Sequence, residues 1–349
     1  MGIFDGVGSW ASKGHDPGEF ARGFAEAVAT NITAQRLEES ASHNQNMKEG
    51  MSRQRFVKGV NLEQALEYAT VNTIGKGTCT ACLVTYDPRR ELLSGVNIGD
   101  SGALLVRRDA GGTPFVALRS VTQRHGFNQP YQLGTASRDK PRDAVPFGFF
   151  VREGDVLVLA TDGLLDNMYE TDIVRCIADA CDREAESASA SVNISLQPGL
   201  GGLAADLAGT LARRAFELSR DNDRITPWEE EAVAAGIILP RYSIEESQGK
   251  GGFELAASLW GFALDLGVLS GLKTRRGGGK KFTKRQNDSR MRAVSEKDAL
   301  RFRGGKVDDI TVVVATVQQT RALRSVDSAK VDQNSGLAAT DGGRGFSGT

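Results

Sequence analysis

The chain has 349 residues, with 43 Lys and Arg against 44 Asp and Glu and a formal net charge of −1. Hydrophobic residues make up 40% of the sequence and charged residues 25%, which excludes a wholly disordered, collagen-like or coiled-coil protein. A charge balance this even gives no global reason to expect binding to nucleic acid, so no nucleic-acid partner is expected.

Two helices are predicted in the first part of the chain. Over residues 18–35, apolar residues recur at helical spacing after the start signal Asp16–Pro17. The same spacing, carried by Leu62, Leu66 and Ala69, predicts a second helix.

The pattern then changes to short apolar runs bounded by Gly, Asp and Pro, which predict strands over residues 80–86, 103–106 and 156–160. The last of these is continuously apolar and is expected to be buried on both faces. Beyond it, apolar residues at helical spacing predict helices over residues 173–178 and 203–218. A β-branched run over residues 310–317 predicts a final strand.

Four cysteines are too few for a disulfide framework in a chain of this length. Cys79 and Cys82 have CxxC spacing, but they lie in an apolar run and have no second ligand pair at zinc spacing. We interpret them as small buried hydrophobic residues. Met1–Asp5 has neither a basic region nor an apolar stretch, so no targeting peptide is expected, and a reducing intracellular compartment fits best.

Residues 241–300 do not have the composition of a packed domain. An apolar stretch over 255–272 is followed by nine Lys and Arg residues interleaved with glycine over 273–292. This composition favours a flexible insertion. The alternative is a docking loop for an acidic partner or an anionic membrane surface. No transmembrane segment is expected, because Asp265 within the apolar stretch makes insertion costly by roughly 2.5–3.5 kcal/mol. Residues 319–349 predict a disordered tail.

The most informative feature is a set of carboxylates at predicted strand ends: Asp5, Asp100, Asp162 and Asp308. Taken alone, any Asp beside a glycine is more often a turn residue than a ligand. Several converging carboxylates would repel one another unless a cation neutralised them. Hard oxygen ligands without a local His or Cys favour Mg²⁺ or Mn²⁺ over zinc.

Five motifs in order resemble the metal-dependent type 2C protein serine/threonine phosphatases, at residues 3–10, 77–82, 99–102, 160–167 and 305–311. The first motif, with Val7, and a further motif over 127–133 are similar to the organellar branch of that family, mitochondrial or plastid. The resemblance covers about residues 1–230 and 301–318.

The resemblance implies an α+β fold, a four-layer α-β-β-α sandwich of two antiparallel sheets flanked by helices. The phosphatase domain would span residues 1–318, interrupted by the insertion at 241–300. The family normally has an earlier strand with a Glu-Asp pair, so the domain is expected to be truncated at its N-terminus. A missing strand would leave an unpaired sheet edge.

The resemblance also implies a centre of two Mg²⁺ or Mn²⁺ ions. Asp5 would bridge the two ions, and Gly6 would offer its carbonyl to one of them. Asp162 and Asp308 would ligate the other ion, so that Asp5, Asp162 and Asp308 are the catalytic set. Asp100, with Asp162, would form a weaker third site.

Other positions near the centre are given supporting or structural roles. Asp166 and Asp309 match family positions close to the metal ions. Val7 stands where many relatives have a His that protonates the leaving group, and Gly102 replaces an Arg often found after Gly-Asp-Ser. His125 is expected to have a structural or loop role.

The implied reaction is hydrolysis of phosphoserine or phosphothreonine in protein substrates by a metal-activated water, without a covalent intermediate. The alternatives are a catalytically impaired phosphoprotein-binding pseudophosphatase or short isoform, and a small-molecule phosphohydrolase on the same fold. A mitochondrial or plastid location is suggested by the family branch.

Overall fold

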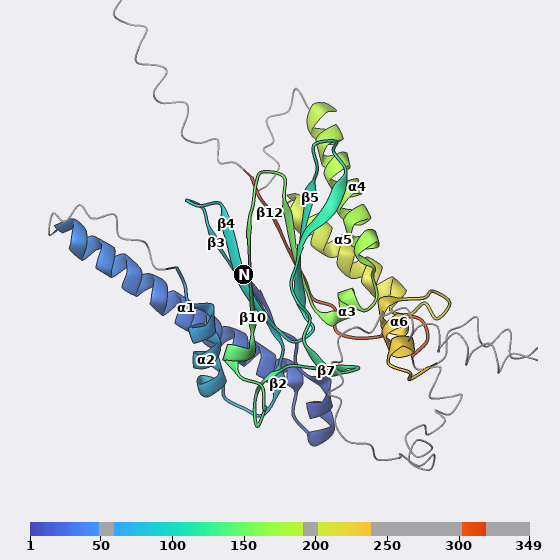
Figure 1. Cartoon of the computed structure of the whole chain (residues 1–349), viewed down its shortest axis with the longest axis horizontal. Helices are drawn as coiled ribbons and strands as arrows, with labels where there is room; N and C mark the ends of the chain where they lie inside the picture. Colours follow the sequence, from blue (N-terminus) through green and yellow to red (C-terminus); the bar gives the residue numbers. More distant parts are fainter. Residues whose placement is uncertain (49–58, 191–201, 239–301, 319–349) are drawn as a thin grey trace, which may run out of the picture.

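Two antiparallel β-sheets lie face to face at the centre of the structure, a computed structural model that describes residues 1–48, 59–190, 202–238 and 302–318 (Figure 1). The first sheet has the order β1-β3-β4-β10: Gly2–Ile3, Ala81–Asp87, Leu92–Ile98 and Val145–Phe150. The second has the order β12-β11-β5-β6: Val312–Thr316, Val156–Ala160, Gly102–Arg108 and Pro114–Arg119. Two short pairs join β2 (Thr78–Cys79) to β9 (Leu133–Gly134) and β7 (Arg124–Gly126) to β8 (Gln129–Pro130).

Helices cover the outer faces of both sheets (Figure 1). The first sheet is covered by α1 (Pro17–Lys48) and α2 (Leu62–Asn72), and the second by α4 (Glu170–Ala190) and α5 (Gly202–Leu218). The short helix α3 (Asp162–Leu165) follows β11 directly, and α6 (Pro227–Ala234) lies near the same end of the sandwich (Figure 1). Short 3-10 helices cover Gly8–Lys13 and Pro141–Asp143.

Three hydrophobic clusters hold the four layers together. Phe24 of α1 packs with Leu83 of β3 between the first helix layer and its sheet. Leu159 of β11 belongs to the cluster between the two sheets. Leu211 of α5 packs with Val158 on the outer face of the second sheet. Full burial of each such side chain stabilises the fold by about 1.5–3 kcal/mol.

Strand β11 shows why a central strand of this sandwich has a continuously apolar sequence. Its outward side chains, Val156, Val158 and Ala160, belong to the cluster under the helices. Its inward side chains, Leu157 and Leu159, belong to the cluster between the sheets. Both faces of the strand are therefore buried, as the sequence predicts.

The strand register brings distant chain segments to one end of the sandwich. Ala160 of β11 lies opposite Gly102 of β5 and opposite Val312 of β12. The turn that carries Asp100 connects Ile98 of the first sheet to Gly102 of the second. The residues just beyond these strand ends therefore meet at the same end of both sheets.

The α+β class and the four-layer α-β-β-α sandwich are confirmed. Every strand and helix expected from the sequence is present, with shifted ends. The first helix continues to Lys48, and the strand expected over 310–317 covers only 312–316. The structure adds elements that the sequence analysis did not predict, including β6, β10 and α6.

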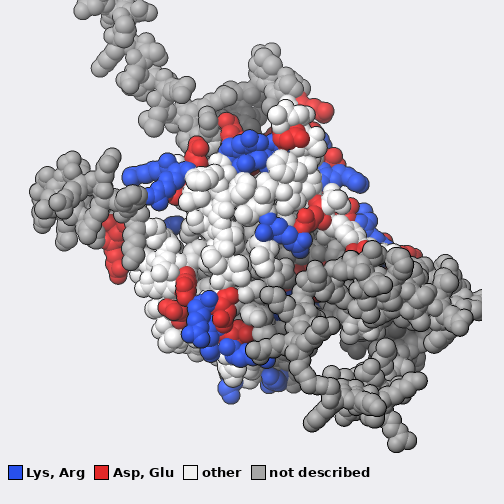
Figure 2. All heavy atoms as spheres, viewed as in Figure 1, with Lys and Arg blue, Asp and Glu red and all other residues white. Residues whose placement is uncertain are grey.

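The basic and apolar parts of the expected insertion, and the expected tail over 319–349, lie outside the described residues. Within the residues that are described, no helix is long and apolar enough to cross a membrane. On the face shown in Figure 2, Lys and Arg lie beside Asp and Glu rather than in separate areas, consistent with the near-zero net charge.

Candidate metal centre

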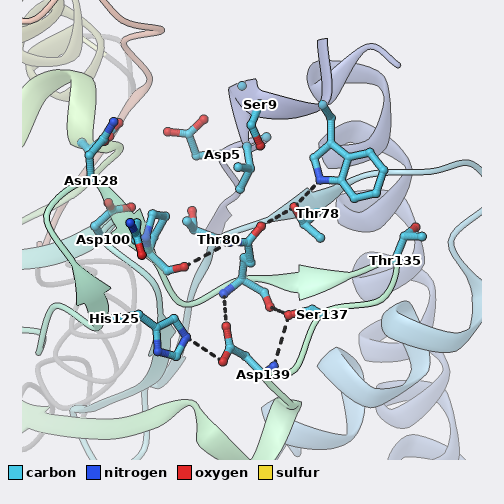
Figure 3. A pocket seen from close by; sticks show the side chains of 18 of the residues that line it. Asp5, Ser9, Thr78, Thr80, Asp100, His125, Asn128, Thr135, Ser137 and Asp139 are labelled. Carbon is cyan, nitrogen blue, oxygen red and sulfur yellow. Dashed lines mark hydrogen bonds and ion pairs between the residues drawn. The ribbon is translucent and has the colours of Figure 1, made fainter. Parts of the chain in front are cut away.

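All five residues predicted to contact metal line one pocket of about 770 Å³: Asp5, Gly6, Asp100, Asp162 and Asp308. They come from four separate places in the chain: Asp5 and Gly6 follow β1, Asp100 lies between β4 and β5, Asp162 follows β11, and Asp308 precedes β12. Asp5 and Asp100 point into the pocket, with His125 and Asp139 further along its wall (Figure 3). The convergence that the sequence analysis predicted is therefore present.

The segment with Asp5 and Gly6 is fixed by backbone pairing. The backbone N–H of Thr80 donates to the carbonyl of Asp5 at 2.9 Å, and the N–H of Val7 donates to the carbonyl of Thr78 at 2.9 Å. A Cβ atom at Gly6 would lie 2.2 Å from the carbonyl oxygen of Pro17, so only glycine fits here.

The segment with Asp162 is tied to the one with Asp308. The Thr161 hydroxyl donates to the Asp309 carbonyl at 3.0 Å and accepts from the Thr311 N–H at 3.0 Å. A Cβ atom at Gly163 would lie 2.4 Å from that same carbonyl oxygen of Asp309. This close approach places Asp162 and Asp308 side by side although they are far apart in sequence.

Lys306 lies among the predicted ligands. Its Nζ is 2.7 Å from Oδ2 of Asp308 and 3.0 Å from Oδ2 of Asp166, and it also contacts Oδ2 of Asp162. The Lys306 backbone is held in turn by the Asn167 amide. That amide accepts from the Lys306 N–H at 2.8 Å and donates to the Lys306 carbonyl at 2.8 Å.

Arg124 of β7 supplies a second cation. Its Nε is 3.3 Å from Oδ2 of Asp100, its Nη2 is 3.2 Å from Oδ1 of Asp166, and its Nη1 contacts Glu231 of α6. The Arg124 side chain is only 17% exposed, so these pairs are poorly screened by water.

The carboxylates still outnumber the cations. Burial, followed by the charge of Asp162, raises the pKa of Asp5 to about 9. The same two causes raise the pKa of Asp100 to about 7, although Arg124 opposes the shift. Both shifts show that the site disfavours its own full ionisation.

The donor set fits a hard divalent cation. Carboxylates and one backbone carbonyl suit Mg²⁺ or Mn²⁺. Oδ1 of Asp162 is buried and has no hydrogen-bond partner among the described residues, and a bound cation would satisfy it.

In the metal-free structure, however, the described residues contain no group of three or more His, Cys, Asp or Glu side chains placed to hold a metal ion. In the same pocket, the Lys306 ammonium contacts both Asp162 and Asp308.

The rest of the pocket wall combines polar and apolar residues. Trp10 donates from Nε1 to the Thr78 hydroxyl at 2.7 Å, and the Lys13 ammonium lies 4.1 Å from the centre of the Trp10 ring. Nε2 of His125 lies 2.9 Å from Oδ1 of Asp139, as the dashed line in Figure 3 marks.

The supporting residues differ in their placement. Asp166 is 4% exposed and pairs with both Lys306 and Arg124. Asp309 is exposed and does not line the pocket, so it acts on the site only through its backbone. His125 lines the pocket and stacks on Tyr131, with ring centroids 4.0 Å apart, as a structural residue would.

The two cysteines of the CxxC pair are buried as the sequence predicts. Cys79 and Cys82 are both 0% exposed, and burial raises the pKa of the Cys82 thiol to about 12. Neither is suited to act as a nucleophile or as a redox residue.

The sequence analysis missed Lys306, Arg124 and Glu231. The signal for Lys306 was its position two residues before Asp308, inside a motif that was already assigned. Arg124 and Glu231 carried no comparable local signal, because they reach the site only through the tertiary fold.

Comparison with known proteins identifies relatives of this chain. Residues 11–213 match the family model described as Stage II sporulation protein E. "Probable protein phosphatase 2C 55" of Arabidopsis thaliana is 30% identical over 238 residues, which cover 68% of this chain and 42% of that protein. "Protein phosphatase PTC7 homolog" of Homo sapiens is 30% identical over 249 residues, which cover 68% of this chain and 69% of that protein.

The chain thus spans less than half the length of the Arabidopsis relative. Among solved structures, "X-ray structure of the photosystem II phosphatase PBCP" superposes with a TM-score of 0.56 at 23% identity. That match covers 91% of this chain and 86% of the other. At this identity the likeness supports the fold.

The raised pKa of Asp5 predicts a pH dependence of stability in the metal-free protein. Between about pH 4 and about pH 9, folded Asp5 keeps a proton that the unfolded chain has released. Unfolding therefore releases protons in this window, and the free energy of unfolding falls as pH rises. In EDTA, we expect the melting temperature to fall from about pH 5 to about pH 9, and to fall less in Asp5→Asn.

The exposed Asp309→Asn variant is the matched control and should follow wild type across the whole pH series. Parallel melting curves for wild type and Asp5→Asn would contradict the burial and repulsion described for Asp5.

Proposed function

The chain belongs to the metal-dependent type 2C protein phosphatases, and from that membership we propose that it hydrolyses phosphoserine and phosphothreonine in proteins. The observation that carries the proposal is the convergence of four aspartates, from four separate motifs, on one pocket: Asp5, Asp100, Asp162 and Asp308. A structural role does not explain this cluster, since like charges brought together destabilise a fold.

We propose that two Mg²⁺ or Mn²⁺ ions bind in this pocket. Asp5 and the Gly6 carbonyl would hold one ion, with Asp5 shared, and Asp162 and Asp308 would hold the other. Asp100 would contribute to a weaker third position. Divalent ions bound there supply a water of lowered pKa and neutralise charge on the phosphoryl oxygens.

The chain's own residues orient these groups and shape the pocket. The side chains of Thr161 and Asn167 fix the segments with Asp162 and Asp308 by donating hydrogen bonds to backbone carbonyls of those segments. Val7 lines the pocket with a side chain that cannot donate a proton. We propose that the leaving hydroxyl takes its proton from water in the pocket.

Direct attack by water agrees with the state of the cysteines. A phosphocysteine intermediate would require an exposed, ionised thiol. Cys79 and Cys82 are buried, and burial raises the pKa of both thiols.

The rest of the pocket wall carries side chains that could bind a phosphorylated peptide beyond its phosphate. Lys13, Arg138 and Asn128 line it, and they offer ion pairs and hydrogen bonds to a polar chain segment. We therefore propose phosphoproteins as the substrates and expect a small-molecule phosphoester to be a poorer one.

We further propose an organellar location, mitochondrion or plastid. Support comes from the motifs over 3–10 and 127–133, and from the similarity to proteins named PTC7 homolog.

We also propose that the phosphatase domain spans residues 1–318 and does not need the insertion at 241–300. Residues that precede that segment form hydrogen bonds with residues that follow it. The Thr226 hydroxyl donates to the Gly304 carbonyl at 2.5 Å, and the Gly304 N–H donates to Oε2 of Glu229 at 2.8 Å. The Gly305 N–H also donates to the carbonyl of Asp221 at 3.0 Å. A basic segment inserted here can be a docking element for acidic partners.

The adjacent Asp308 and Asp309 give a matched test of the metal centre. With a phosphothreonine peptide and Mn²⁺, we expect Asp308→Asn to lower kcat/KM on the order of 100-fold or more, since it removes a predicted ligand. Asp309→Asn makes the same chemical change at an exposed side chain outside the pocket and should stay within about twofold of wild type. Phosphate release is the measurement, and EDTA should abolish it in every variant.

Equal losses in the two variants, or full activity in EDTA, would contradict the assigned ligands. Tight binding of the phosphopeptide without any phosphate release by wild type would favour the pseudophosphatase alternative instead.

A deletion tests the domain proposal. Replacing residues 241–300 with a short Gly/Ser linker should leave Mn²⁺-dependent hydrolysis of p-nitrophenyl phosphate within about twofold of the full chain, because Thr226, Glu229 and Gly304 still meet. A loss confined to phosphoprotein substrates, weakening as salt is added, would fit a docking role. Collapse of the small-substrate activity in a folded variant would show that the insertion builds the active site.

A further inference from the structure

The Lys306 ammonium lies where the proposed metal centre needs a cation. It contacts Oδ2 of Asp162 and lies 2.7 Å from Oδ2 of Asp308 and 3.0 Å from Oδ2 of Asp166. The Lys306 side chain is only 12% exposed. Three carboxylates around one desolvated ammonium form a strong local charge cluster.

This placement is built into the fold. The side-chain amide of the fully buried Asn167 binds both the N–H and the carbonyl of Lys306, each at 2.8 Å. The Lys306 Nζ also lies 4.9 Å from the centre of the Trp228 ring, within range of a cation–π contact. The Asn167 hydrogen bonds to the Lys306 backbone and the contact with Trp228 together hold the lysine side chain among the aspartates.

A metal ion held by Asp162 and Asp308 would compete with this ammonium for the same oxygens. An ion bound to Oδ2 of both residues must occupy the space between them, and the Lys306 Nζ already lies within bonding distance of both. A divalent ion and an ammonium in that space would also repel each other strongly.

The other side of the cluster is open to a cation. Oδ1 of Asp162 is buried and unpartnered among the described residues. Within the same described part of the chain, no Lys or Arg forms an ion pair with Asp5. Arg124 approaches from a different direction and pairs with Asp100 and Asp166. A cation beside Asp5 would therefore meet no ammonium, whereas one between Asp162 and Asp308 would.

We propose that Lys306 is a built-in competitor for the divalent ion: it holds Asp162 and Asp308 together in the metal-free protein and must leave them when an ion binds there. Lys306 thereby sets the metal affinity of the site and makes its two positions unequal, with the one beside Asp5 filling first. This inference rests on the metal centre of the proposed function.

The test compares Lys306→Met, which keeps most of the side-chain volume and removes the charge, with wild type. Mn²⁺ is titrated by calorimetry into full-length protein stripped of metal. We expect the weaker of the two dissociation constants to tighten by roughly tenfold or more in Lys306→Met. We also expect the melting temperature in EDTA to fall, because three carboxylates lose their cation.

Lys76→Met is the matched control, because it makes the same change at an exposed lysine that does not line the pocket. It should bind Mn²⁺ with the affinities of wild type. If Lys306→Met does not fold without metal, both proteins are prepared with Mn²⁺ and the rate of metal loss to excess EDTA is followed. The prediction is then slower loss from Lys306→Met than from wild type.

An unchanged or weakened Mn²⁺ affinity in Lys306→Met would overturn the inference, since Lys306 would then support the ion rather than compete with it. If wild type binds Mn²⁺ and Lys306→Met binds it with the same affinity, the inference about Lys306 fails while the proposed metal centre is retained. No Mn²⁺ binding by any of the proteins would overturn both.

Discussion

Repulsion among buried carboxylates is the constraint that the rest of the site has to meet. Asp5, Asp100 and Asp162 lie in one pocket at low exposure, and burial together with mutual repulsion raises the pKa of the first two. Lys306 and Arg124 offset part of this repulsion by forming ion pairs with the carboxylates. The remainder is what a divalent ion would neutralise, so the unfavourable electrostatics of the metal-free protein and the proposed chemistry have the same origin.

The two sheets make this clustering of aspartates possible, because the aspartates follow or precede strands whose ends are fixed by strand pairing. Pairing of Ala160 with Gly102 and Val312 aligns three segments of the second sheet. Gly6 and Gly163 then allow backbones to approach more closely than any side chain permits. The hydrophobic clusters on both faces of each sheet supply the stability that offsets the crowding of charge.

Much of this could be predicted from local sequence, and the exceptions have physical reasons. The continuously apolar run Val156–Ala160 predicted a buried strand, and both of its faces are covered. The Asp-Gly pairs at Asp5 and Asp162 indicated candidate ligands, and both line the pocket. Strand β10 was missed because Pro146 and Gly148 interrupt its apolar pattern, although both are accommodated in the sheet. The roles of Lys306 and Arg124 could not be derived, since their partners are fixed by strand register and not by neighbours in sequence.

Anomalous diffraction from crystals grown with Mn²⁺ is the most direct test that this aspartate cluster binds divalent metal ions. We expect two strong anomalous peaks in the pocket, one beside Asp5 and the Gly6 carbonyl and one between Asp162 and Asp308, with the Lys306 ammonium moved away from the second. If crystals grown with Mn²⁺ show no anomalous density among these residues, the cluster is not a metal site.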